Sequence, residues 1–88
     1  MDRKMCLYKI KKEPHVALSE AYEENNQWYV QDTEGHVKQI DPLYIGPFDA
    51  SKLYAFGLLI INYFKNNTSA IDKICELFDV DPTLVTSN

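Results

Sequence analysis

Hydrophobic and polar residues alternate through much of the first half of the chain, and this two-residue period is typical of β-strands. Residues 5–11 are rich in strand-forming side chains. Residues 15–22 have features of both a strand and a helix, and we favour a strand. Asn25-Asn26 marks a turn. Together with a hairpin further along the chain, these stretches predict three or four antiparallel strands.

The hairpin is the clearest local feature, and it is formed by residues 27–31 and 36–40. The four residues between these stretches include Gly35, which tolerates the positive φ that tight loops require. A loop of four residues predicts that Val30 pairs with Val37 across the hairpin.

The second half of the chain is predicted to be helical. The Asp-Pro pair at 41–42 should end the hairpin, because proline lacks the amide hydrogen that a sheet uses. The Gly-Pro pair at 46–47 marks a further turn. A helix then covers residues 50–65, with Asp49 or Ser51 as its N-cap.

This first helix is apolar on more than one side. A helical wheel gives one apolar stripe, formed by Leu53, Phe56, Gly57, Ile60 and Phe64. A second apolar set, formed by Tyr54, Ala55, Leu58 and Leu59, lies round the back, where only Lys52, Asn62 and Lys65 break the pattern. Apolar surface on most sides requires cover on most sides, so a second helix or a second chain should lie against the back.

A second helix, over residues 70–78, has one apolar face and one charged face. Thr68 or Ser69 should cap it, and Pro82 should begin one more helical turn. The sequence therefore predicts a single α+β domain over residues 1–88. In this fold an antiparallel sheet of three to four strands packs against two C-terminal helices.

The chain has 88 residues, of which 45% are hydrophobic, and a net charge of −4, which is typical of a globular protein. Its charge is unevenly distributed, because the first twelve residues carry five of the nine basic side chains and only one carboxylate. These basic residues are Arg3, Lys4, Lys9, Lys11 and Lys12. We favour the interpretation that they protect an exposed sheet edge from aggregation, ahead of a patch for an acidic partner.

The sequence contains no pattern typical of catalysis or of cofactor binding. His15 and His36 lack further ligands at metal spacing, and the glycines are not grouped in a phosphate-binding loop. Cys6 and Cys75 are far apart, which suits buried thiols in a reducing compartment. We therefore expect no catalytic, cofactor or metal site. Without a signal-peptide pattern or a membrane-spanning apolar run, the sequence predicts a cytoplasmic protein.

The leading hypothesis is a small, acidic, non-enzymatic module that binds another protein, as an inhibitor or adaptor of a nucleic-acid-handling protein. Carboxylates on the strand-connecting turns suit docking on a basic groove, and the back of the first helix supplies apolar contacts. The candidate interface residues are Glu20, Glu23, Glu24, Asp32, Glu34, Tyr29, Tyr54, Leu58, Leu59 and Asn62. In style the chain resembles phage and mobile-element proteins that block host enzymes, including anti-CRISPR and anti-restriction proteins.

Two alternatives stay open. The protein could bind nucleic acid through its basic first strand, where Tyr8 lies among the basic residues, or through its C-terminal helix and turn. It could instead form a homodimer through the helix over residues 50–65. Membrane partners are not expected.

Two short segments resemble known binding motifs. Residues 69–85 resemble the first helix and turn of a helix-turn-helix, although the recognition helix is almost absent and Asp79 and Asp81 would repel phosphate. Residues 27–30 and 46–48 resemble parts of peptide-binding modules of the GYF type. Neither resemblance carries a site residue to this chain.

Overall fold

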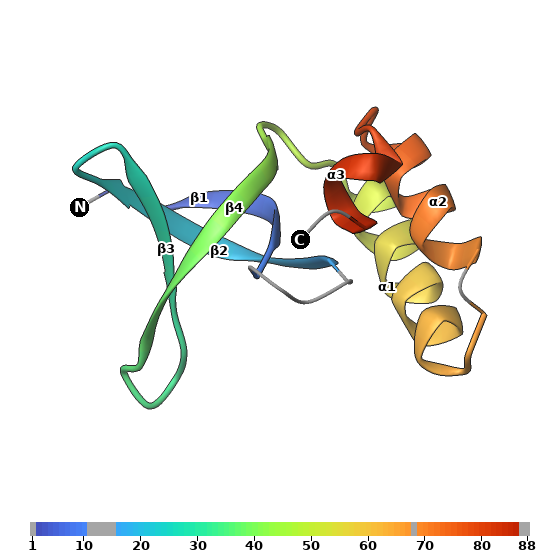
Figure 1. Ribbon diagram of the computed structural model, residues 1–88, viewed down its shortest axis with the longest axis horizontal. Coiled ribbons are helices and arrows are strands. Elements are labelled where there is room, and N and C mark those ends of the chain that lie inside the picture. The colour runs from blue at the N-terminus through green and yellow to red at the C-terminus, as the bar shows by residue number, and fades with distance from the viewer. Residues whose placement is uncertain (1, 11–15, 68, 87–88) are drawn as a thin grey trace.

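The computed structural model describes residues 2–10, 16–67 and 69–86. A four-stranded antiparallel sheet in the first half of the chain is followed by helices in the second half, as the sequence predicts (Figure 1). The strands are β1 (Lys4–Lys9), β2 (Val16–Glu24), β3 (Gln27–Gln31) and β4 (Val37–Ile45). The helices are α1 (Ala50–Phe64), α2 (Ser69–Leu77) and the short α3 (Pro82–Thr86).

The four strands close into a small barrel, because β1 pairs with β2 on one side and with β4 on the other.

Several turns and helix ends are formed by residues with left-handed backbone, that is, with positive φ. Asn25 and Asn26 both have positive φ in the two-residue turn between β2 and β3, which is the geometry of a type I′ turn. Asn66 follows α1 and Asp79 follows α2, and both also have positive φ, a conformation that commonly ends helices.

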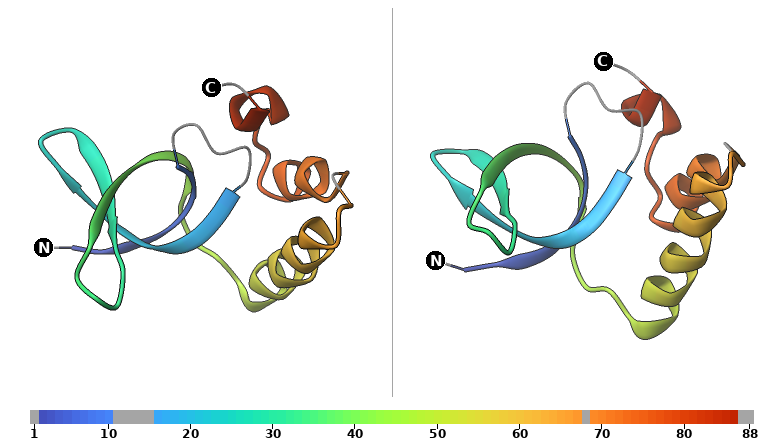
Figure 2. Two further views of the ribbon diagram at one scale, coloured as in Figure 1. Left: turned by 60° about the horizontal axis from the view of Figure 1, so that its bottom comes forward. Right: turned by 90° about the horizontal axis from the view of Figure 1, so that it is seen from below.

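Two hydrophobic cores result from the alternation along β1. Cys6 and Tyr8 point into the barrel, where they pack with Val30 and Ile40. Leu7 points the other way and packs against the helices. The helices lie together on one side of the barrel (Figure 2), so β1 is covered on both faces. This second core is formed by Leu7, Val16, Ile71, Ile74, Cys75, Phe78, Val80 and Val85.

The barrel corrects the prediction that the basic first strand is an exposed edge. Because β1 has a neighbour on each side, it offers no free edge. Lys9 is almost fully buried, with 4% of its surface exposed. Lys11 and Lys12 lie outside the described residues.

The predicted hairpin register is wrong by one residue. Val30 pairs with Lys38, and Val37 pairs with Gln31. The reason lies in the loop, where the amide of Asp32 donates to the carbonyl oxygen of His36 and leaves only three residues between them. Gly35 has a φ of +92°, as expected for the third position of such a three-residue loop.

The Asp-Pro pair does not end β4, which continues to Ile45. The strand pairs with β3 as far as Ile40 and with β1 from Asp41 onward. Pro42 lies at this change of partner, next to a shift in register between Leu7 and Tyr8. Proline is tolerated at such irregular positions of a sheet, so β4 bends instead of ending.

Candidate interaction surface

Helix α1 begins where its sequence predicts. The Asp49 carboxylate accepts a hydrogen bond from the amide of Lys52 at 2.8 Å and another from the hydroxyl of Ser51. These donors lower the pKa of Asp49, the Lys52 amide most strongly. The cap fixes the start of the helix and therefore the direction in which each of its faces points.

One face of α1 packs against the rest of the molecule. Phe56, Leu59, Ile60 and Tyr63 contact the core that α2 and the barrel share. The ring centroids of Phe56 and Phe78 are 6.4 Å apart. Even on this side the packing is partial, because these four side chains are only half-buried and α1 contains no buried residue.

The opposite face of α1 is apolar and open to solvent. Its large side chains are exposed to very different degrees: Leu53 39%, Leu58 48%, Ile61 52%, Phe64 70% and Tyr54 72%. Ala50 and Gly57 lie on the same side of the helix. We call this set, Ala50, Leu53, Tyr54, Gly57, Leu58, Ile61 and Phe64, the open face.

The open face corrects the predicted apolar stripe. Leu53 and Phe64 were assigned to the same side as Phe56 and Ile60, but only the latter two are covered. Leu59, a predicted interface residue, lies on the covered side. Asn62 is exposed beside the open face. The physical reason is that α2 covers α1 from one direction only, and the hydrophobic pattern of α1 does not reveal that direction.

A shallow hollow lies at the centre of the open face. It is bordered by Leu53, Tyr54, Gly57, Leu58 and Ile61 and has a volume of about 340 Å³. Gly57 forms its floor, and a Cβ atom added there would have no atom within 4 Å. The glycine is therefore not required by a close contact inside the monomer.

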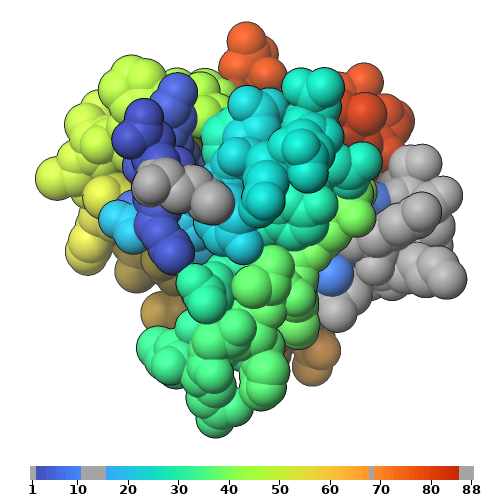
Figure 3. All heavy atoms as spheres, turned by 90° about the vertical axis from the view of Figure 1, so that its left-hand side faces the viewer, coloured from blue at the N-terminus to red at the C-terminus, as the bar shows by residue number. Residues whose placement is uncertain are grey.

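The predicted acidic interface residues lie on the barrel, away from α1. Glu23 and Glu24 are exposed at the β2–β3 turn, and Asp32 and Glu34 are exposed in the β3–β4 loop. Figure 3 shows this end of the molecule, where the β3–β4 loop projects as a separate lobe. The carboxylates thus form two groups rather than one surface.

The other two predicted interface residues on the barrel, Glu20 and Tyr29, differ in exposure and in their contacts. Glu20 is exposed on β2, opposite Met5 of β1. Tyr29 is half-buried and stacks on Tyr22, with their ring centroids 5.7 Å apart. Tyr22 is buried, and the guanidinium of Arg3 lies 5.4 Å from the centre of its ring, so this tyrosine pair already has a cationic neighbour.

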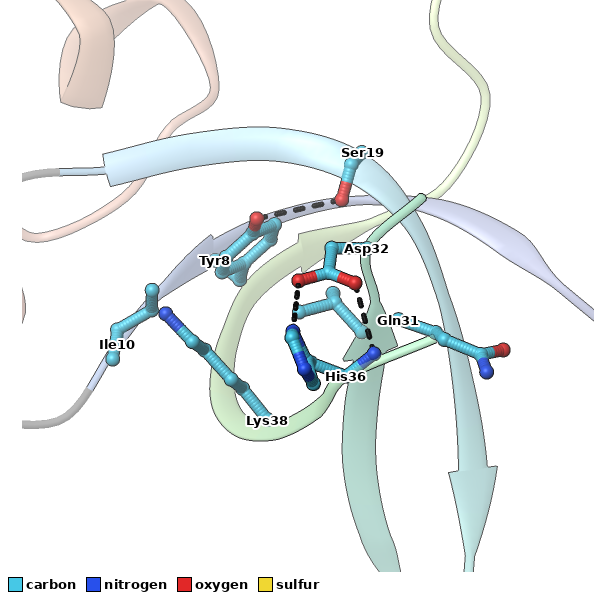
Figure 4. A pocket seen from close by; sticks show the side chains of 8 residues that line it. Tyr8, Ile10, Ser19, Gln31, Asp32, His36 and Lys38 are labelled. Atoms are coloured by element: carbon cyan, nitrogen blue, oxygen red, sulfur yellow. Dashed lines mark hydrogen bonds and ion pairs between the residues drawn. The ribbon is translucent and has the colours of Figure 1, made fainter. Parts of the chain in front are cut away.

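A polar recess of about 270 Å³ opens beside the β3–β4 loop (Figure 4). His36 Nδ1 lies 3.2 Å from the Asp32 carboxylate and 3.6 Å from the Glu34 carboxylate. The Asp32 pKa is lowered, mainly by the hydrogen bond from the backbone amide of His36. The His36 side chain is 70% exposed. The pair lies in open solvent, so it lacks the desolvation that strengthens electrostatic interactions in a closed site.

The basic first strand does not form one surface. Arg3 and Lys4 are exposed, whereas Lys9 is buried and donates to the carbonyl oxygen of Leu84. At the other end of the described chain, α3 covers five residues, Pro82–Thr86.

Comparison of this chain with known proteins gave no match. No family model matches it, and neither a curated protein nor a solved structure is similar enough to count as a match.

Other kinds of site have little support in the described residues. No three histidine, cysteine or acidic side chains among them are placed to hold a metal ion. Both thiols are free and buried, and burial raises the pKa of Cys6 to about 11 and also raises that of Cys75. Protonated, buried thiols are poor nucleophiles.

None of the helices in residues 2–10, 16–67 and 69–86 is long and apolar enough to cross a membrane.

The sequence contains a signal for the open face that a simple wheel does not use. Positions 50, 54, 57, 61 and 64 alternate steps of four and three residues. This is the spacing of a seam between two helices. Ile61, which was not among the predicted interface residues, is one of these seam positions.

Proposed function

We propose that this protein is a non-enzymatic binding module that docks on another protein through the open face of α1. The observation that carries the proposal is the exposure of five large apolar side chains on one side of a single helix. Monomeric proteins rarely leave such a contiguous patch in water. Covering one of these leucines or isoleucines stabilises a complex by about 1.5–3 kcal/mol when burial is complete.

The composition of the open face suits a protein partner better than a nucleic acid. None of its seven residues is charged, whereas binding to a phosphate backbone depends on lysine and arginine. Tyrosine and phenylalanine are also favoured at the centres of protein interfaces. The nucleic-acid alternative relied on the basic first strand, and the burial of Lys9 removes one of its five charges from the surface.

The acidic turns of the barrel provide a second surface in this proposal. Glu23, Glu24, Asp32 and Glu34 are exposed, and both turns lie at the end of the molecule opposite the helices (Figure 1). Such carboxylates speed encounters with a basic groove, as in an inhibitor or adaptor of a nucleic-acid-handling protein. A cytoplasmic location is part of the same proposal, because a reducing compartment keeps Cys6 and Cys75 as free thiols.

Site-specific photo-crosslinking in cells that produce the full chain tests the proposal. A benzophenone amino acid replaces Tyr54 on the open face, and in a matched control it replaces Glu76, which is exposed on α2. We expect discrete adducts of higher mass from position 54 and few from position 76. Adding Leu58→Lys should remove the adducts from position 54. If positions 54 and 76 give the same yield, the open face is not a docking surface.

A further inference from the structure

We propose that the occupant of the open face is a second copy of this chain. The two copies would be related by a two-fold axis, with the two α1 helices crossing at Gly57. This inference rests on the proposed function, because it identifies the partner of the same face. Its three supports are the spacing of the open face, the hollow at its centre and the area that it offers.

The seam is centred on Gly57, with Ala50 and Phe64 seven residues away on either side and Tyr54 and Ile61 three and four residues away. The seam residues occupy positions 50, 54, 57, 61 and 64, and Gly57 is the middle residue of α1, which runs from Ala50 to Phe64. A two-fold interface brings the same patch of each copy together. A patch with a small residue at its centre and large side chains on both sides is suited to meet its own copy.

The hollow explains why a glycine occupies the middle of an exposed helix. Glycine costs about 1 kcal/mol relative to alanine at such a position, and nothing inside the monomer uses the missing side chain, because no atom lies within 4 Å of a Cβ built there. Small residues at a crossing point allow two helix axes to approach closely. Tyr54 and Leu58 border the hollow, so the same side chains of a second copy have a space to enter.

The open face reaches the minimum area for a specific interface if contact covers all of its exposed apolar surface. From the exposed fractions of Leu53, Tyr54, Leu58, Ile61 and Phe64, its large side chains offer roughly 500 Å² on each copy, if a whole large apolar side chain contributes about 150–250 Å². Two copies would then bury about 1,000 Å², which is the lower limit for a specific interface.

Charge does not oppose this pairing. Helix α1 contains Lys52 as its only charged residue, and the side chain of Lys52 points to the covered side, where its ammonium lies 5.4 Å from the centre of the Tyr44 ring. The carboxylates of the barrel turns lie at the far end of each molecule (Figure 1). The exposed carboxylates of these turns, Glu23, Glu24, Asp32 and Glu34, are therefore held away from the contact.

Sedimentation equilibrium of the full chain, from micromolar to millimolar concentration, tests the inference. We expect a reversible rise from the mass of one chain, 10.2 kDa, to twice that mass. Ile61→Glu should raise the dissociation constant at least about a hundredfold, since it places charge in a buried interface. Asn62→Glu is the matched control, because Asn62 is the next residue, is also exposed and lies outside the open face. It should leave the dissociation constant nearly unchanged.

A third variant distinguishes close packing of the two helices at Gly57 from non-specific hydrophobic association. Gly57→Phe adds apolar surface to the open face but fills the hollow, and the open space there lets each chain keep its fold. We expect the dissociation constant to rise at least about tenfold. Equal or tighter association of Gly57→Phe would overturn the crossing at Gly57. Circular dichroism at low concentration should show the same helix content for all three variants.

The outcomes distinguish this inference from the proposed function. If the chain stays monomeric at every concentration, the proposal that its partner is a second copy is wrong. Adducts between position 54 and other proteins would then still support docking on a different partner. A dimer that Ile61→Glu leaves intact also overturns the inference, because the contact must then lie elsewhere. If the chain is monomeric and position 54 gives no adduct, both proposals fail.

Discussion

The ammonium group of Lys9 in β1 donates a hydrogen bond to the backbone carbonyl oxygen of Leu84 in α3, at a distance of 3.2 Å. The two residues are 75 positions apart in the chain, and only 4% of Lys9 is exposed. Carbonyl groups in the last turn of a helix lack partners within the helix and carry partial negative charge. This contact therefore ties the first strand of the barrel to the last helix.

Replacing the ammonium of Lys9 should loosen α3. Lys9→Met keeps most of the apolar stem but removes the charge, and we expect the free energy of unfolding to fall by about 1–2 kcal/mol. Urea denaturation measures this change. Hydrogen exchange should also become faster in residues 82–86. Lys4→Met, at an exposed lysine of the same strand, is the control and should change stability by less than about 0.5 kcal/mol. Equal effects of the two substitutions would contradict a specific role for the contact.

Phe78 should be the most sensitive position in the core beneath the helices. It is 1% exposed, and its ring lies 5.3 to 5.4 Å from the rings of Phe48 and Tyr44. Phe78→Ala should lower the free energy of unfolding by about 3–5 kcal/mol, which is a large part of the total for a domain of this size. Thermal unfolding followed by circular dichroism measures the loss.

Phe64→Ala is the matched control for that substitution. Phe64 is 70% exposed on the open face, so at concentrations where the chain is monomeric its truncation should change stability by less than about 0.5 kcal/mol. A large decrease in the free energy of unfolding for Phe64→Ala, or a small decrease for Phe78→Ala, would contradict the core described above.

Acid should destabilise the fold through three carboxylates that accept backbone hydrogen bonds. The pKa values of Asp32, Asp49 and Asp81 are lowered chiefly by the amides of His36, Lys52 and Thr83, respectively. Because the folded pKa lies below the unfolded value of about 4, this stability is present above about pH 4 and is lost as the pH falls through the folded values.

The triple variant Asp32→Asn, Asp49→Asn, Asp81→Asn tests this pH dependence. Asparagine keeps an acceptor oxygen but does not titrate, so the urea midpoint should change less between about pH 5 and pH 2 than in the original chain. If the urea midpoint of the triple variant falls with pH as steeply as that of the original chain, other carboxylates are responsible for the acid sensitivity.

Two glycines should respond to alanine in opposite directions. Gly35 has a φ of +92°, where a side chain is strained, so Gly35→Ala should destabilise the chain by about 1 kcal/mol or more. Gly57 is helical with open space around it, so Gly57→Ala should stabilise the monomer by about 1 kcal/mol. Urea denaturation at low concentration measures both. A loss of stability in Gly57→Ala would show that α1 is already in contact with something at that position.

Several parts of this structure could be predicted because they depend on residues close together in the chain. Asp49 caps α1 through an amide three positions away, and Asn25 and Asn26 form their turn by their own backbone preferences. The apolar face of α2 has a clean helical period, and Ile71, Ile74 and Phe78 are buried as that period predicts. Ser69, one of the two predicted caps of α2, is instead its first residue, and Thr68 lies outside the described residues.

The candidate site could be predicted only in part. The excess of apolar residues on α1 pointed to an uncovered side, and Tyr54 and Leu58 are on it. The pattern could not separate Leu59, which is covered, from Ile61, which is exposed. Both lie in a helix that is apolar nearly all round, so the wheel alone gives no direction.

The sequence by itself determined where the strands and helices lie, apart from the second half of β4, and how several of them begin and end, because those features follow from preferences and hydrogen bonds within a few residues. The tertiary structure alone decided that β1 lies between β2 and β4, that Lys9 is buried against α3, and which face of α1 stays open. These features depend on contacts between residues far apart in the chain. Such contacts are selected by how whole surfaces fit together, and a local pattern does not record that fit.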